Sequence, residues 1–182
     1  MKIAVITPTI IGRESLLTEC IGSVKSQDTG GDFCHFIGVD YDGIGCGQTR
    51  NRIVAEVPSE FDWLAFLDDD DILLPHHLRM LSMVSDSSDI IYSDCRTEGW
   101  EKTWESGPLH LEKLWRRNYI PVTVFMRRRV FEAVHGFSKV FAEDWDLWKR
   151  LSIRGYRFTY VPEVTWVYRQ VQGHSRMLVR GC

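Results

Sequence analysis

The sequence predicts an α/β protein whose central sheet is mostly parallel and is flanked by helices. Short apolar strands alternate with helical segments along the first half of the chain, and this alternation is typical of parallel sheets with helical crossovers. Two of the apolar strands run directly into acidic residues, at 40–42 and at 68–71. Ligands bind at the carboxyl ends of strands in open α/β sheets, so both acidic segments are expected at the binding edge.

The first half of the chain is predicted to alternate strand and helix up to a fourth strand. Each strand is a short apolar run, and each helix has apolar residues at helical spacing on one face, as Leu16, Cys20 and Val24 illustrate. The predicted elements are strand 3–6, helix 13–27, strand 36–39, helix 48–57, strand 63–67, a helix opening at Pro75, and strand 89–94.

The pattern changes after residue 94. A polar, loop-like stretch carries Trp100 and Trp104, and Trp115 beyond it is predicted to be buried by packing. The predicted elements beyond that stretch are helix 109–118, strand 122–126, helix 127–135, helix 141–151, and an extended segment at 158–169 with a break at Pro162.

Composition predicts one soluble domain. At 182 residues the chain is long enough for one sizeable core and too short for two ordinary domains. Its hydrophobic content of 44% and charged content of 26% are those of globular proteins. The net charge of −3 does not indicate the broad basic surface of a nonspecific nucleic-acid binder, although the arginines at 127–129 could form a local basic patch.

A cytoplasmic location is expected. No run of the sequence approaches the roughly 20 apolar residues of a membrane span, and the first residues lead into a strand-like run without the long apolar core of a signal peptide. The five cysteines are scattered, and none forms a CxxC pair. They therefore predict reduced thiols rather than a zinc site or a disulfide framework.

The acidic segment at 68–71 predicts a cation site. Four adjacent carboxylates follow a buried, aromatic strand, and they repel one another unless a cation lies among them. Mg²⁺ and Mn²⁺ prefer oxygen ligands and commonly bridge to substrate phosphates. Together with Asp40 and Asp42 at the end of another strand, the arrangement suits a nucleoside diphosphate and its metal. The alternative is a solvated acidic turn.

The acids at the start of the predicted helix 141–151 have two interpretations. Glu143 and Asp144 are favoured there by the helix dipole, which contributes ~0.3–1 kcal/mol, and that structural role alone would account for them. The functional interpretation is a general base that removes a proton from an acceptor hydroxyl.

Motifs in a fixed order extend over residues 3–176, and together they resemble those of a small single-domain family 2 glycosyltransferase with the GT-A fold. That fold is a Rossmann-like one for nucleotide-diphospho-sugar transfer. Each piece is weak alone, and it is the order and spacing that carry the resemblance. The matching pieces are Ile6-Thr7-Pro8-Thr9, the helix to Ser26-Gln27, Val39-Asp40, Thr49-Arg50-Asn51, residues 66–75, Gly136-Phe137, residues 143–147, Tyr168-Arg169 and His174.

The resemblance implies roles for the donor side of the site. Asp40 matches the aspartate that contacts the nucleotide base, and Thr9 lies in the first loop on the nucleotide side. Asp42 and Arg50 are expected to bind the nucleotide sugar as well. The usual Asp-Gly-Ser-x-Asp after the second strand is replaced here by residues 40–45, Asp-Tyr-Asp-Gly-Ile-Gly, so the contacts of Asp42 depend on a changed loop.

The resemblance also implies the metal and catalytic residues. Asp68-x-Asp70 matches the DxD motif, with Asp70 on the metal and Asp68 or Asp69 toward ribose and diphosphate. The four consecutive aspartates leave the register open by one residue. Asp144 matches the catalytic base, with Glu143 beside it. His174 matches a tail position that reaches the metal or diphosphate in some relatives, and an exposed tail histidine is the alternative.

The implied function is a metal-dependent, inverting transfer of a sugar, with a UDP-sugar favoured as donor and Mn²⁺ or Mg²⁺ as cofactor. Residues 1–95 would form the nucleotide-binding half and residues 96–182 the acceptor half with a C-terminal tail. The acceptor is an unknown hydroxyl compound: nucleic acid is not indicated, but a modified base stays open. The alternatives are a non-catalytic nucleotide-sugar or glycan-binding module and a haloacid-dehalogenase-like phosphatase. The phosphatase is disfavoured because the first strand ends in Thr-Pro-Thr.

Overall fold

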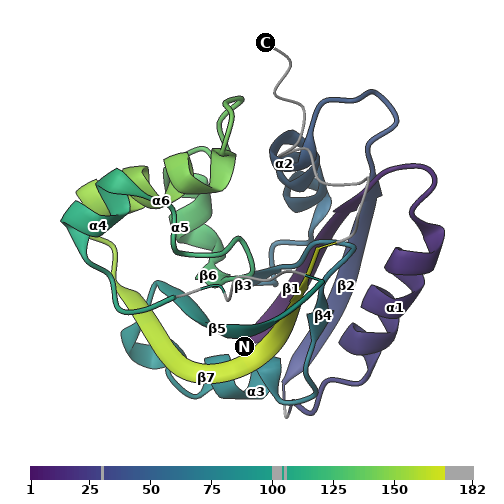
Figure 1. The fold of residues 1–182 in the computed structure, drawn as a ribbon, viewed down its shortest axis with the longest axis horizontal. Helices are drawn as coiled ribbons and strands as arrows, with labels where there is room; N and C mark the ends of the chain where they lie inside the picture. The colour runs from purple at the N-terminus through teal and green to yellow at the C-terminus, as the bar shows by residue number, and fades with distance from the viewer. Residues whose placement is uncertain (30, 100–103, 105, 171–182) are drawn as a thin grey trace.

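A computed structural model describes residues 1–29, 31–99, 104 and 106–170. Within these residues the strands form one seven-stranded sheet in the order β2-β1-β3-β6-β5-β7-β4 (Figure 1). The strands are β1 (Lys2–Thr9), β2 (Asp32–Val39), β3 (Trp63–Phe66), β4 (Ile72–Leu73), β5 (Ile90–Glu98), β6 (Phe125–Arg127) and β7 (Phe158–Arg169).

Helices fill most of the connections between the strands. The α-helices are α1 (Glu14–Lys25), α2 (Cys46–Glu56), α3 (His77–Ser82), α4 (Leu111–Arg116), α5 (Arg128–Ala133) and α6 (Glu143–Ile153), and a short 3-10 helix η1 covers Ser85–Ser87.

The predicted α/β class and mostly parallel sheet are confirmed. Strand β1 runs parallel to β2 and β3, and β5 runs parallel to β7. Strand β6 pairs antiparallel with both β3 and β5, and β4 pairs antiparallel with β7. Five described strands therefore share one direction, and only the short strands β4 and β6 oppose it. Of these two reversed strands, β6 lies beyond residue 94, where the chain leaves the simple strand–helix alternation, and β4 lies before it.

The sheet has an apolar core on each face because successive side chains of a strand point to opposite sides. Ala4 and Ile6 of β1 pack with α2, α4, α5 and α6, whereas Ile3 and Val5 pack with α1 and α3. Figure 1 shows α5 and α6 on the inside of the curved sheet, and α1 and α3 outside it. Helices α2 and α6 thus share one face, which places their polar ends close enough to interact.

Tertiary pairing corrects one local expectation and adds one strand that was not predicted. Pro162 does not end the last strand. Register shifts beside Ser93, Asp94 and Cys95 of β5 absorb it, which fits the confinement of proline to edges and bulges. The added strand is β4, which follows the acidic residues and pairs with β7. The helix predicted to open at Pro75 follows it as α3, which begins at His77.

Trp115 was expected to be buried, and that expectation is wrong. It lies on α4 with 52% of its surface exposed, and Lys149 Nζ lies 5.3 Å from the centre of its ring. Trp104 is partly buried and donates its indole N–H to the Tyr119 carbonyl oxygen at 3.2 Å. Trp100 lies outside the described residues.

None of the helices that the structure describes combines the length and the apolar composition that crossing a membrane requires.

Candidate active site

The loops that follow β1, β2 and β3 lie at one edge of the sheet. The backbone N–H of Asp40 donates to the Thr9 carbonyl oxygen at 2.8 Å, and that of Leu67 donates to the Ile6 carbonyl oxygen at 3.0 Å. These bonds continue the parallel pairing to the last residues of the strands. The acidic residues after β2 and β3 therefore begin at the same edge.

Three of the four consecutive aspartates form a compact ligand set. Asp68, Asp70 and Asp71 each offer one carboxylate oxygen, and the three oxygens lie within 4.8 Å of one another. Asp69 points elsewhere: it accepts a hydrogen bond from Thr9 Oγ1 at 2.5 Å and pairs with Arg13 at 2.9 Å. The structure thus separates Asp69 from its neighbours and adds Asp71 to the two aspartates of the expected motif.

Burial makes two members of this ligand set, Asp70 and Asp71, costly to ionise. Burial, and then repulsion from Asp68, raises the pKa of Asp70, although pairing with Arg13 at 2.5 Å opposes the shift. The pKa of Asp71, which is 1% exposed, is raised well above its ordinary value by the same two causes. A divalent cation would relieve both effects, and carboxylate oxygens are the ligands it prefers. The residues present therefore fit such a cation.

The acidic loop is held in place by β7 and α1. The backbone N–H of Arg169 donates to Asp71 Oδ1 at 2.9 Å, and its side chain donates to the Asp70 carbonyl oxygen. The same guanidinium pairs with Glu19 of α1 at 2.6 Å. The last residue of the last strand thus fixes the position of the turn after β3.

Arg50 joins the acidic loop to the start of α6. It is 2% exposed, and its guanidinium pairs with Asp68 on one side and with Glu143 Oε1, at 3.1 Å, on the other. The exposed Cys46 thiol also donates to Glu143 Oε1, at 2.8 Å. Helix α2 therefore supplies the contacts that bring two acidic segments, far apart in the chain, into one site.

Asp144 lies beside this junction and has two hydrogen-bond donors of its own. Asn118 Nδ2 donates to its Oδ2 at 2.8 Å, and the backbone N–H of Trp145 donates to its Oδ1 at 2.7 Å. Burial raises the pKa of Asp144, and these hydrogen bonds partly oppose the rise. A carboxylate whose pKa lies above the ordinary value is a better proton acceptor than an exposed aspartate.

The residues predicted to bind the nucleotide differ in their burial and in their contacts. Asp40 is 7% exposed and accepts backbone N–H groups from Ile44 at 2.9 Å and from Gly45 at 2.8 Å, so it shapes its own loop. The Asp42 side chain is 73% exposed and pairs with Arg52 at 3.6 Å. Asp42 therefore faces solvent on the outer side of the loop.

Several residues of the site had no individual prediction. Arg13, Asp71, Asn118 and Arg169 all bond to the acidic groups. Asp71 and Arg169 fall within matching motifs, so a signal for them existed. Arg13 begins a helix that belongs to a matching piece but was given no role of its own, whereas Asn118 stands in a segment with no such signal, because only the folded chain brings it to Asp144. His174 lies outside the described residues.

Comparison with protein-family models gives no match, and no curated protein matches by sequence. Solved structures do match. Residues 1–349 of S. aureus TarS, in complex with UDP-GlcNAc, are 17% identical with a TM-score of 0.76, and the match covers 95% of this chain and 60% of that one. A Pyrobaculum calidifontis mannosyltransferase, in complex with GDP-Man and Mn²⁺, is 14% identical with a TM-score of 0.66, covering 94% of this chain and 58% of its own.

A third match comes from an animal enzyme. The catalytic domain of Drosophila β1,4-galactosyltransferase 7 is 16% identical with a TM-score of 0.73, and the match covers all of this chain and 76% of that one. The chain spans about 60% of the TarS structure that it matches. These likenesses show the fold, which is the GT-A fold of glycosyltransferases, and they confirm the fold expected from the ordered motifs.

Proposed function

We propose that this protein is a glycosyltransferase that moves a sugar from a nucleotide-diphosphate sugar to an acceptor hydroxyl. One observation carries the proposal: on a GT-A fold, Arg50 links a carboxylate cluster at the end of β3 to the acidic start of α6. Pairing with the buried guanidinium brings together two acidic groups that lie far apart in the chain. A site that handles a diphosphate and a proton needs both.

Asp68, Asp70 and Asp71 would hold Mn²⁺ or Mg²⁺. When bound, such a cation neutralises the negative charge that the departing diphosphate develops. Arg13 and Arg50 contribute fixed positive charge at the same loop. Asp71 joins the expected Asp70 here because the structure brings its carboxylate into the cluster.

Asp144 is the proposed base. It would take the proton of the acceptor hydroxyl as that oxygen attacks the anomeric carbon from the face opposite the diphosphate, which inverts the carbon. Asn118 fixes one oxygen of the carboxylate, and Glu143 is held away from it by Arg50 and Cys46. Glu143 is therefore proposed to orient the start of α6 rather than to share the proton.

The donor is proposed to be a UDP-sugar. Two of the three similar proteins were solved with uridine nucleotides, UDP-GlcNAc in TarS and UDP-Gal in a mutant form of the galactosyltransferase, and the third with GDP-Man. Asp40, Thr9 and Asp69 lie on the loops where a base and ribose would bind. The nucleotide-binding half at 1–95, the acceptor half at 96–182, membership of family 2 and a cytoplasmic location stay predictions.

A titration and an assay test the proposal. UDP should bind more tightly with Mn²⁺ than without it in calorimetry, and UDP should be released from a UDP-sugar when an acceptor is supplied. The Asp144→Asn variant should still bind UDP with Mn²⁺, and its transfer rate should fall by roughly 10²–10⁴-fold, the usual contribution of general base catalysis. Asp146→Asn, in the same helical turn but paired with Arg150, is the control and should transfer normally.

Other outcomes would redirect the assignment. Transfer by Asp144→Asn at the wild-type rate would show that Asp144 is not the base. Tight, Mn²⁺-dependent binding of UDP with no turnover of any donor would support the non-catalytic binding module instead.

A further inference from the structure

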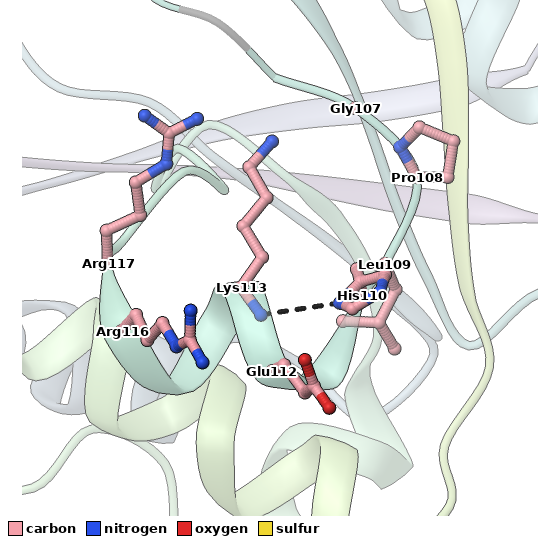
Figure 2. Close-up of a pocket in the computed structure, with 8 residues that line it drawn as sticks. All are labelled: Gly107, Pro108, Leu109, His110, Glu112, Lys113, Arg116 and Arg117. Atoms are coloured by element: carbon pink, nitrogen blue, oxygen red, sulfur yellow. Dashed lines mark hydrogen bonds between the residues drawn. The ribbon is translucent and has the colours of Figure 1, made fainter.

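A second site lies around α4. It is a pocket of about 600 Å³ lined by residues 107–110 and by Glu112, Lys113, Arg116 and Arg117 (Figure 2). Pockets for small molecules commonly measure about 300–1,000 Å³, so the size suits a compact ligand. None of the residues assigned above to the metal, the nucleotide or the base lines it.

The pocket is basic in a protein that is acidic overall. Its lining carries three Lys or Arg side chains against one carboxylate, Glu112, while the whole chain has a net charge of −3. Figure 2 shows Lys113 and Arg117 extending in the same direction from α4, with Gly107 and Pro108 across from them. Lys113 Nζ also lies 4.0 Å from the centre of the Tyr119 ring, a contact that favours one orientation of the ammonium group.

The same segment positions the proposed base. Asn118, which follows Arg117 in the chain, donates to Asp144 at 2.8 Å, and the Leu114 carbonyl oxygen of α4 accepts from Trp145 Nε1 at 2.6 Å. A ligand held by Lys113 and Arg117 would therefore contact the same segment that orients Asp144. This connection favours the acceptor, rather than the donor, as the ligand of the pocket.

We propose that this pocket binds a phosphate group carried by a small acceptor, a phosphate ester of a polyol or sugar. The inference rests on the proposed function and adds the chemical class of the acceptor. A phosphate has several acceptor oxygens and a charge near −2 at neutral pH, which matches a lysine and an arginine extending in the same direction better than a single carboxylate does. A nucleic-acid backbone would instead need an extended basic face, and the positive charge here is local and concave.

Binding of glycerol 3-phosphate, with glycerol as the neutral comparison, tests the proposal by calorimetry or NMR titration at low ionic strength. Glycerol 3-phosphate should bind and glycerol should not. In the double variant Lys113→Gln/Arg117→Gln, affinity for glycerol 3-phosphate should fall at least tenfold. The matched control is Lys25→Gln/Arg79→Gln, which removes the same two charges from α1 and α3 on the other face of the sheet and should bind like the wild type.

Binding of UDP with Mn²⁺, measured in the same variants, separates this proposal from the proposed function. Unchanged UDP binding shows that the pocket variant is folded. If glycerol 3-phosphate then binds the pocket variant and the wild type equally, or binds neither, the pocket proposal is overturned and the donor site is unaffected. A duplex oligonucleotide that loses affinity in the pocket variant while glycerol 3-phosphate does not bind would also overturn it. If the wild-type protein does not bind UDP with Mn²⁺, that result counts against the proposed function and not against phosphate binding in the pocket.

Discussion

Arg50 is the residue on which the arrangement of the site depends most directly. Its guanidinium is buried, and a buried charge is tolerated only when it is paired. Asp68 and Glu143 supply that pairing, and the Phe137 ring lies 5.3 Å from the guanidinium carbon. Arg50 was expected to touch the nucleotide sugar. In the structure its described partners are protein carboxylates, so its role in donor binding stays a prediction.

Asn118 should set the pH dependence of transfer through Asp144. Its amide stabilises the ionised carboxylate and so opposes the rise in pKa that burial causes. Replacing Asn118 by Ala should therefore raise the pKa of Asp144 further. Because the base acts only when deprotonated, the acid limb of the pH–rate profile should move to higher pH, with little change at alkaline pH. The measurement is the transfer rate as a function of pH.

The control for that experiment is Gln48→Ala. Gln48 also donates an amide N–H in this region, but to the Phe137 carbonyl oxygen rather than to a carboxylate. Its acid limb should stay at the wild-type position. An acid limb in Asn118→Ala that coincides with the wild type would contradict the role of Asn118, and with it the assignment of Asp144 as the group that titrates.

At the scale of elements, the site depends on the close approach of α2 to the start of α6. Gly47 of α2 makes that approach possible: a Cβ atom built there would lie 2.6 Å from Glu143 Cγ and 3.2 Å from Phe137 Cβ. The absence of a side chain at this position thus lets Arg50, one turn further along α2, reach Glu143. Packing between the helices, and not the helical propensity of either one, explains the glycine.

Gly47→Ala should therefore displace the start of α6. The overpacking is expected to reduce the free energy of unfolding by about 1–3 kcal/mol and to slow sugar transfer, since Glu143 and Asp144 would shift together. Urea unfolding and the transfer rate would measure the two effects. Gly22→Ala is the matched control, because a Cβ atom at this position of α1 meets nothing within 4 Å. That variant should gain about 0.5–1 kcal/mol of stability and keep its activity, and equal behaviour of the two variants would refute the packing argument.

At the scale of the whole molecule, the carboxylate cluster makes stability depend on pH and on metal. The pKa values of Asp70 and Asp71 are raised in the folded protein, so it binds more protons than the unfolded chain between the ordinary aspartate value and the raised values. Without metal these two groups therefore make the folded state less stable as the pH rises through that window. Metal binding requires the ionised carboxylates and should oppose the loss.

Mn²⁺ should accordingly raise the melting temperature, and more at pH 7 than at pH 5. At a concentration 100 times the dissociation constant, the linkage relation gives about 2.7 kcal/mol of stabilisation, which for a chain of this size is a rise of roughly 5–11 °C. Thermal unfolding with and without Mn²⁺ at the two pH values measures this. Asp71→Asn should weaken the effect, whereas Asp42→Asn, at the exposed end of the β2 loop, should not. A rise that is equal at both pH values would argue against ligation by these carboxylates.

The sequence alone determined the α/β class, the order of most elements, and the acidic segments after β2 and β3. These features are local: apolar runs, helical spacing and charged turns act over a few residues, so they can be recognised without knowing what they pack against. The tertiary structure decided which aspartates share a site, that β4 and β6 run against the other strands, and that Trp115 is exposed. The contacts that build the site join residues far apart in the chain: Arg13 and Asp70 are 57 residues apart, and Arg50 and Glu143 are 93 residues apart. Hydrogen bonds and ion pairs at that separation form only once the sheet has brought the segments together.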